Sequence, residues 1–211
     1  MGNLEAARLL AKQALGAAKK RRQINAFFKK QGYISLGKGA WLGFRNRDVV
    51  SGCLVNGPPL DTYIETFILP AFDRHEFISL ALGNRVVHCS PDTDTQEECK
   101  LALNVYRTEM SNVRSSTDLV SYLDTHQIEG HYPIWVRYIC YLKLLELDTA
   151  IQYLSESRRN LLHRVQMEQF DEIDKFVTIR DAEGILRVLE RWSGFSEKIF
   201  GPLGRSFSVY R

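Results

Sequence analysis

The chain has no long hydrophobic run, few prolines and no apolar leader. None of its apolar stretches reaches the roughly eighteen residues that a membrane-spanning helix needs. Glu5, Arg8 and Lys12 interrupt the apolar core that a signal peptide would have, and Ala6 stands where a myristoylation signal has Ser or Thr. With only six prolines and 45% hydrophobic residues, the composition is typical of a globular protein. We therefore expect a soluble, cytoplasmic protein that does not contact a membrane.

The four cysteines form no CxxC pair and lie far apart, at Cys53, Cys89, Cys99 and Cys140. In a cytoplasmic chain this spacing favours free thiols that are mostly buried as small hydrophobic groups. Structural zinc sites have closer ligand pairs. The sequence therefore predicts no metal site and no cofactor.

Motifs for nucleophilic or nucleotide chemistry are also missing. Gly37-Lys38-Gly39 lacks the GxxxxGK[ST] order of a phosphate-binding loop and predicts a tight β-turn instead. The best acid–base candidates are Asp73, His75 and Glu76, if one turn presents them together. The alternative is a hydrated loop with a local ion pair. We assign no catalytic residue and favour a protein that is not an enzyme.

What the sequence does have is a strong separation of charge. Residues 1–50 hold eleven Lys and Arg against two acids, Glu5 and Asp48, so this quarter carries +9. Because the net charge is +3, the rest of the chain carries −6. A basic segment on an acidic body can steer toward a polyanion or dock on an acidic partner.

Cations within this basic segment define the candidate nucleic-acid-binding site. They are Lys19, Lys20, Arg21, Arg22, Lys29 and Lys30, on a helix predicted over residues 3–30. Each cation that contacts a phosphate releases counterions, which favours binding to DNA or RNA. The alternatives are a face that docks on a protein or simply stays solvated. A membrane-surface helix is less favoured, because alanines dominate the apolar stripe and bury little in lipid.

The hydrophobic pattern predicts an α+β fold: an N-terminal helix, a small mainly antiparallel sheet, then a C-terminal helical bundle. Short apolar runs between glycines indicate the strands, with Thr62–Leu69 open between strand and short helix. From Pro91 onward the period is helical. We expect two subdomains, 1–90 and 91–211, packed as one compact unit. The expected strands are Tyr33–Leu36, Ala40–Phe44, Val49–Val55, Thr62–Leu69, Phe77–Leu82 and Arg85–Cys89.

Residues 134–147 are apolar on nearly all sides of the predicted helix. Such a helix lies either in the centre of its own bundle or in an interface. We expect Trp135, Tyr138 and Tyr141 to contact a partner, and keep a fully internal helix as the alternative.

The stretch "TYIETFILPAFDRHEFISLALGNR" resembles segments of small uncharacterised bacterial proteins, some encoded near defence genes. It covers about a tenth of the chain, and no residue roles come with it. We expect a non-catalytic accessory subunit of an intracellular multiprotein complex, in which larger protein subunits and nucleic acid are the partners. The resemblance implies antiviral defence as the setting. The alternatives are an immunity-type protein binder and a small hydrolase centred on Asp73, His75 and Glu76.

Overall fold

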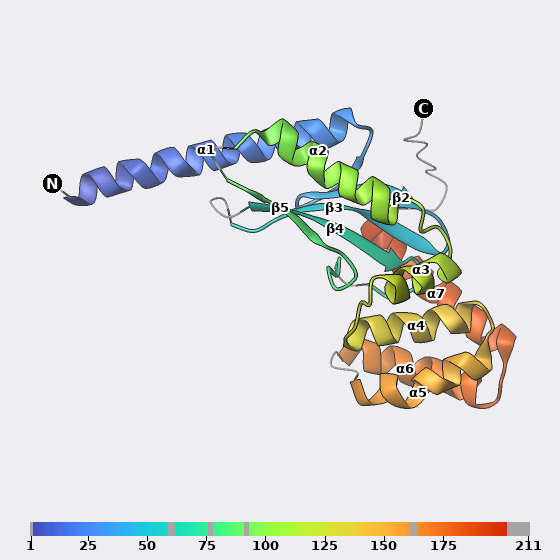
Figure 1. Cartoon of the computed structure of the whole chain (residues 1–211). Helices are drawn as coiled ribbons and strands as arrows, with labels where there is room; N and C mark the ends of the chain where they lie inside the picture. Colours follow the sequence, from blue (N-terminus) through green and yellow to red (C-terminus); the bar gives the residue numbers. More distant parts are fainter. Residues whose placement is uncertain (1, 59–61, 76–77, 91–92, 161–163, 202–211) are drawn as a thin grey trace.

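A long helix, a five-stranded sheet and a group of helices follow one another along the chain in a computed structural model (Figure 1). The structure describes residues 2–58, 62–75, 78–90, 93–160 and 164–201. This order confirms the predicted α+β class. The elements are α1 (Gly2–Lys30), β1 (Ile34–Gly37), β2 (Ala40–Arg45), β3 (Val49–Asn56), β4 (Thr62–Pro70), β5 (Arg85–Cys89), α2 (Thr95–Val105), the π-helical turn η1 (Tyr106–Met110), α3 (Ser116–Thr125), α4 (His131–Lys143), α5 (Leu147–Asn160), α6 (Arg164–Thr178) and α7 (Ala182–Phe200).

Helix α1 is long because its sequence is rich in alanine and contains no proline. It ends at a glycine: Gly32 takes a φ of 82°, and the Tyr33 amide donates back to the Phe28 carbonyl at 3.1 Å. The C-terminal half of α1 packs on the body through Ile24 and Phe28, which are fully buried. The N-terminal half projects past the sheet (Figure 1). Only half of this helix is therefore held by the fold.

The sheet is a simple meander, with strand order β1-β2-β3-β4-β5 and every neighbouring pair antiparallel. Gly37, Lys38 and Gly39 all have positive φ and form the hairpin turn between β1 and β2. This turn confirms the interpretation of Gly37-Lys38-Gly39 as a turn. Residues 62–70 form a strand, which settles the alternative left open for that segment.

The predicted strand Phe77–Leu82 is wrong in its described part, because residues 78–82 form loop and turn. Phe77 lies outside the described residues. Strand β4 already has β3 on one side and β5 on the other, so no ladder position is left beside it. Ile78 and Leu80 pack instead beneath the sheet, against a cluster that includes Phe67. Their apolar character serves packing rather than strand pairing.

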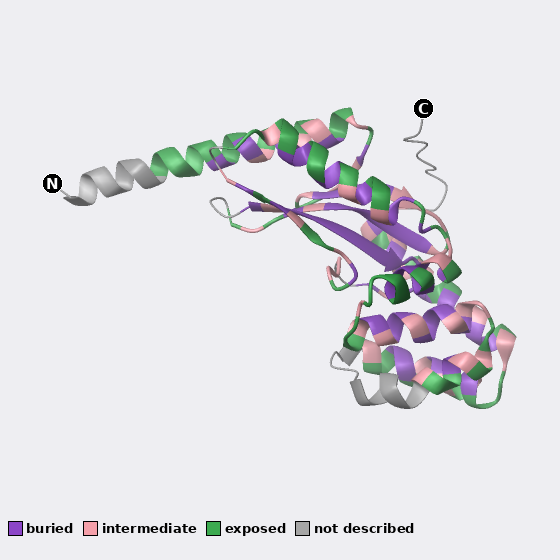
Figure 2. Cartoon of the chain, viewed as in Figure 1, coloured by how far each residue is buried: buried purple, intermediate pink, exposed green. Residues whose placement is uncertain are grey.

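The two faces of the sheet bury different clusters, shown in purple in Figure 2. Helices α1 and α2 cover one face (Figure 1), where Trp41, Cys53 and Ile64 lie in the main core. On the other face, Leu42, Val50 and Phe67 meet Phe200 at the end of α7. The sheet therefore joins the N-terminal helix to the last helix of the chain.

The C-terminal helices continue the main core that begins under α1 and α2. Trp135 of α4 and Trp192 of α7 are fully buried, with ring centroids 6.2 Å apart. Helix α4 ends in a turn in which Leu145 has a φ of 59°, and α5 begins at Leu147. In the described part of the chain, no helix combines the length and apolar character that crossing a bilayer requires.

Candidate nucleic-acid interface

The predicted cations do not share one environment, and Lys20 differs most. Its ammonium lies between α1 and α2, where it pairs with the Glu98 carboxylate at 2.8 Å. It also donates to the Thr93 hydroxyl at 2.7 Å, to the Thr93 carbonyl at 3.1 Å and to the Ser90 carbonyl. The side chains of Lys20 and Glu98 are 7% and 9% exposed, so the pair is removed from water. Lys20 fastens α1 to the body and does not face a ligand.

Arg21 is also engaged inside the molecule, although less deeply. It is half-buried, and its Nη2 donates to the carbonyl of Val55 at the end of β3 at 3.0 Å. This bond satisfies a carbonyl near the end of the central strand and ties α1 to the sheet. We therefore treat Arg21, like Lys20, as part of the joint between helix and sheet.

The other four predicted cations are exposed: Lys19, Arg22, Lys29 and Lys30. Lys12, about two turns before Lys19, is exposed as well. At about 100° per residue, all five fall within roughly 100° of arc, opposite the buried Ile24. We call this line of five the outward cation face. Lys12 was missed by the sequence prediction, although a helical-wheel projection of residues 3–30 contains the signal.

The outward cation face is free of acids. No Asp or Glu occurs between Glu5 and Asp48 in the sequence. Between its cations lie small or apolar residues, of which Leu15 is 69% exposed. From Lys12 to Lys30 the line runs about 27 Å at 1.5 Å per residue. It is therefore a straight, positive edge on the outside of the molecule.

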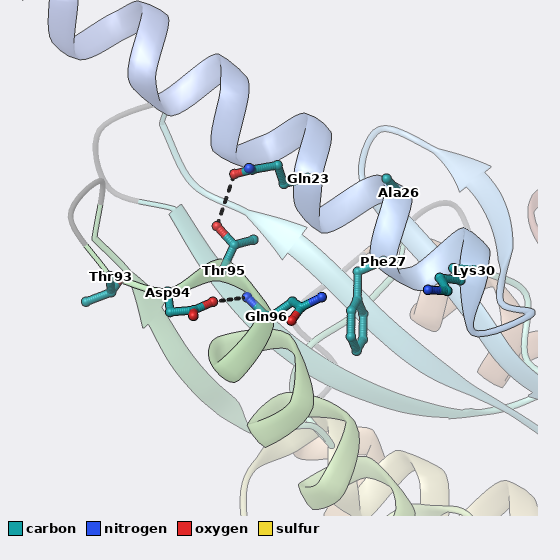
Figure 3. A pocket seen from close by; sticks show the side chains of 8 residues that line it. All are labelled: Gln23, Ala26, Phe27, Lys30, Thr93, Asp94, Thr95 and Gln96. Carbon is teal, nitrogen blue, oxygen red and sulfur yellow. Dashed lines mark hydrogen bonds between the residues drawn. The ribbon is translucent and has the colours of Figure 1, made fainter.

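A shallow pocket lies beside this face, between α1 and the start of α2 (Figure 3). It has a volume of about 580 Å³. Thr95 donates to Gln23 at 3.3 Å across it, and Asp94 accepts from the Gln96 amide at 2.7 Å as the N-cap of α2. The Asp94 carboxylate thus satisfies one of the free amides at the start of α2 and puts a negative charge beside the pocket. The lining residues are Gln23, Ala26, Phe27, Lys30, Thr93, Asp94, Thr95 and Gln96.

The residues expected to bind a protein partner lie mostly inside the molecule. Trp135 and Tyr138 are fully buried, and Tyr138 stacks on Phe170 of α6 with ring centroids 6.0 Å apart. Tyr141 is half-buried and stacks on Tyr153 of α5 at 5.6 Å. The sequence left two alternatives for this helix, contact with a partner or a position inside the bundle. The burial of Trp135 and Tyr138 favours the internal position for α4. Buried rings cannot reach a partner, so we assign no docking role to Trp135 or Tyr138.

Asp73 and His75 are placed together at the end of β4, but their polar atoms serve the fold. The Asp73 carboxylate accepts from Tyr132 of α4 at 3.0 Å and from Gln169 of α6 at 2.8 Å. Ser196 of α7 donates to the Asp73 carbonyl. His75 donates from Nε2 to the Pro70 carbonyl at 2.8 Å. Glu76 lies outside the described residues, and the Asp73 turn is a joint between the sheet and three helices.

All four cysteines are free and buried, as predicted. Burial raises the pKa of Cys89 and of Cys99 to about 12, with the nearby Glu98 carboxylate acting in the same direction. Burial also raises the pKa of Cys53 and Cys140. A thiol that stays protonated is a poor nucleophile and metal ligand. Among the residues that the structure describes, no cluster of three or more His, Cys, Asp or Glu is arranged to hold a metal ion.

Comparison of the chain with protein-family models, with curated proteins and with solved structures finds no match. The arrangement of this chain's own residues therefore has to indicate its function.

Proposed function

We propose that the chain is a non-catalytic accessory subunit that holds nucleic acid against the outward cation face of α1. The observation that carries the proposal is the division of labour within "KKRR". Lys20 and Arg21 tie α1 to the body, whereas Lys19 and Arg22 are exposed in line with Lys12, Lys29 and Lys30. Two cations thus hold the helix on the body, and five are exposed to solvent. No Asp or Glu lies between these five in the sequence.

A polyanion suits this face better than an acidic protein surface. A phosphate backbone presents negative charge at regular short intervals, and contact with it releases condensed counterions. Five cations spread over about 27 Å of a straight helix match such a repeating charge. A protein partner would be expected to use apolar contacts as well, and Leu15 is the one large apolar side chain among the described residues of this face.

The test compares two variants that change the net charge equally. Lys19→Gln with Arg22→Gln removes two cations from the outward face. Lys175→Gln with Lys198→Gln removes two exposed cations from α6 and α7 and serves as the control. We expect the first variant to bind a mixed DNA and RNA probe set more weakly by on the order of tenfold or more near 0.1 M salt, and the control to bind like the unmodified chain. Equal losses in the two variants would show a general charge effect and no site on α1.

A second surface, at one end of the helical bundle, supports the subunit part of the proposal. The α4–α5 turn and the α6–α7 turn meet there, where Arg180 pairs with Asp148 at 2.6 Å. Each turn exposes a large apolar side chain: Leu145 is 42% and Ile179 71% exposed. These two exposed apolar side chains can contact a protein partner, whereas Trp135 and Tyr138 are buried and cannot.

The variant Leu145→Asn with Ile179→Asn tests this second surface without disturbing the fold. Asn tolerates the left-handed conformation of residue 145 better than Leu does, so stability should be maintained. We expect salt-resistant protein partners of the unmodified chain, purified with it from its native cells, to be lost from the variant. Retention of the same partners would place the subunit contact elsewhere. Nucleic-acid binding is measured in parallel and should not change.

A further inference from the structure

We propose that the outward cation face takes double-stranded nucleic acid, held by its two phosphate backbones without reading base sequence. The inference rests on the proposed function and makes it more specific. It depends on three features of the described residues: the straightness of the cation line, the place of the aromatic rings, and the acid at the start of α2.

The cation line is rigid and straight, as a duplex is. Helix α1 runs without a break from residue 2 to residue 30, past Gly16. A duplex carries about one phosphate charge for every 1.7 Å of its axis when both strands are counted. The line from Lys12 to Lys30 therefore faces roughly eight base pairs of B-form backbone at 3.4 Å per step. A flexible single strand would have to be straightened to make the same contacts.

Single-strand binding depends on aromatic side chains that stack on unpaired bases. The aromatic residues near the outward face do not offer such a platform. Phe28, Tyr33 and Trp41 are buried. Phe27 is half-buried, packs edge-on against Phe28 at 5.8 Å, and turns toward the pocket beside α2 (Figure 3). Of the five cations, Lys30 alone lines this pocket with Phe27, and the other four lie outside its lining.

The pocket beside Phe27 is a poor path for a strand. Asp94 is exposed at its rim, and its carboxylate would repel a phosphate that followed Lys30 into the pocket. On the outward side, the residues between the cations include Leu15, Gly16, Gln23 and Ala26. Of these four, Gln23 alone has a side chain that can hydrogen-bond a base edge. We therefore expect the line of cations to contact mainly backbone phosphates, and a change of duplex sequence tests this.

The experiment measures fluorescence anisotropy of the full chain with labelled probes of about 20 base pairs, long enough to exceed the eight or so that α1 faces. The probes are a DNA duplex, an RNA duplex, the separate strands of each, and a second duplex of scrambled sequence. We expect at least one kind of duplex to bind about tenfold or more tighter than its own strands, and scrambling to change the affinity by less than about twofold. A duplex of either kind that binds more tightly than its own strands supports the inference. The kind of duplex that binds shows whether the ligand is DNA or RNA.

Other outcomes overturn the inference in distinguishable ways. Strands that bind as tightly as their duplex contradict the duplex preference and leave the proposed function standing. A large preference for one duplex sequence contradicts backbone-only contact. A Phe27→Leu variant is measured alongside: it should bind the duplex like the unmodified chain, and a selective loss of strand binding would place an unpaired base in the pocket. Absence of binding to every probe removes the proposed function together with the inference.

Discussion

Lys19 and Lys20 are neighbours in the chain, but α1 turns by about 100° between them. That rotation places one ammonium in solvent and the other against Glu98, with the Lys20 side chain only 7% exposed. The identical residue type therefore has two tasks that can be separated by mutation. We propose binding as the task of Lys19, whereas the buried pair with Glu98 gives Lys20 a task in stability.

Replacing Lys20 by Met should lower the free energy of unfolding by about 3–5 kcal/mol, because Glu98 is left as a buried charge without its partner. Lys19→Met should change it by no more than about 0.5 kcal/mol. Urea denaturation followed by circular dichroism measures both. A double variant, Lys20→Met with Glu98→Met, removes both charges and should recover much of the loss. Equal effects of the two single substitutions would contradict the burial of Lys20.

For a single residue, the sequence gives the charge and the hydrogen-bonding groups of the side chain, but it does not give the burial or the partners of that side chain. Within "KKRR" nothing local distinguishes Lys20 from Lys19, since the difference comes from where α2 lies, 78 residues further along. Asp73 is similar. Its nearness to His75 in sequence suggested an acid–base pair, whereas its hydrogen-bond partners Tyr132 and Gln169 are 59 and 96 residues away.

At the scale of single elements, one chemical change should have opposite results in β3 and in α1. A Cβ at Gly52 would lie 2.1 Å from the Trp41 carbonyl oxygen and 2.9 Å from the Phe67 ring. Gly52→Ala should therefore destabilise the chain by about 2 kcal/mol or more, because backbone of β2 would have to move. A Cβ at Gly16 meets nothing within 4 Å. Gly16→Ala should raise helix content and stabilise α1 by up to about 1 kcal/mol.

Thermal unfolding and the helical signal at 222 nm test this pair of glycine substitutions together. Gly194→Ala in α7 is the matched control, since it also adds a Cβ to open space within a helix. A melting temperature for Gly52→Ala equal to that of the unmodified chain would contradict the close packing of β2 on β3. A loss of helical signal in Gly16→Ala would contradict an unbroken α1.

The elements themselves were largely predictable. Short apolar runs and glycine turns located β1, β2, β3 and β5 and left β4 open between strand and helix, and the apolar repeat located α1 to within a residue at its start. Residues 78–82 are the exception. An apolar run can either pair in a ladder or pack beneath one, and the choice depends on whether β4 has a free side. The same ambiguity applied to α4, where the helices that pack around it, among them α7 with Trp192, determine that Trp135 is internal.

For the whole molecule, the separation of charge seen in the sequence becomes a separation in space. Most cations of the basic quarter lie on α1, whose N-terminal half projects past the sheet (Figure 1). Lys20 pairs with Glu98 where α1 meets the body, whereas the five cations of the outward face are exposed. This exposure is the property of the whole chain that the proposed function uses.

The measurement that tests this account most directly is the salt dependence of nucleic-acid binding. About five phosphate contacts predict a slope of log K against log salt near −4.5 for a DNA duplex, at about 0.9 per contact. Lys19→Gln with Arg22→Gln should reduce the magnitude of the slope by about two, whereas Lys175→Gln with Lys198→Gln should leave it unchanged. A slope that is the same in all three proteins would contradict the claim that the outward face of α1 is where the phosphates bind.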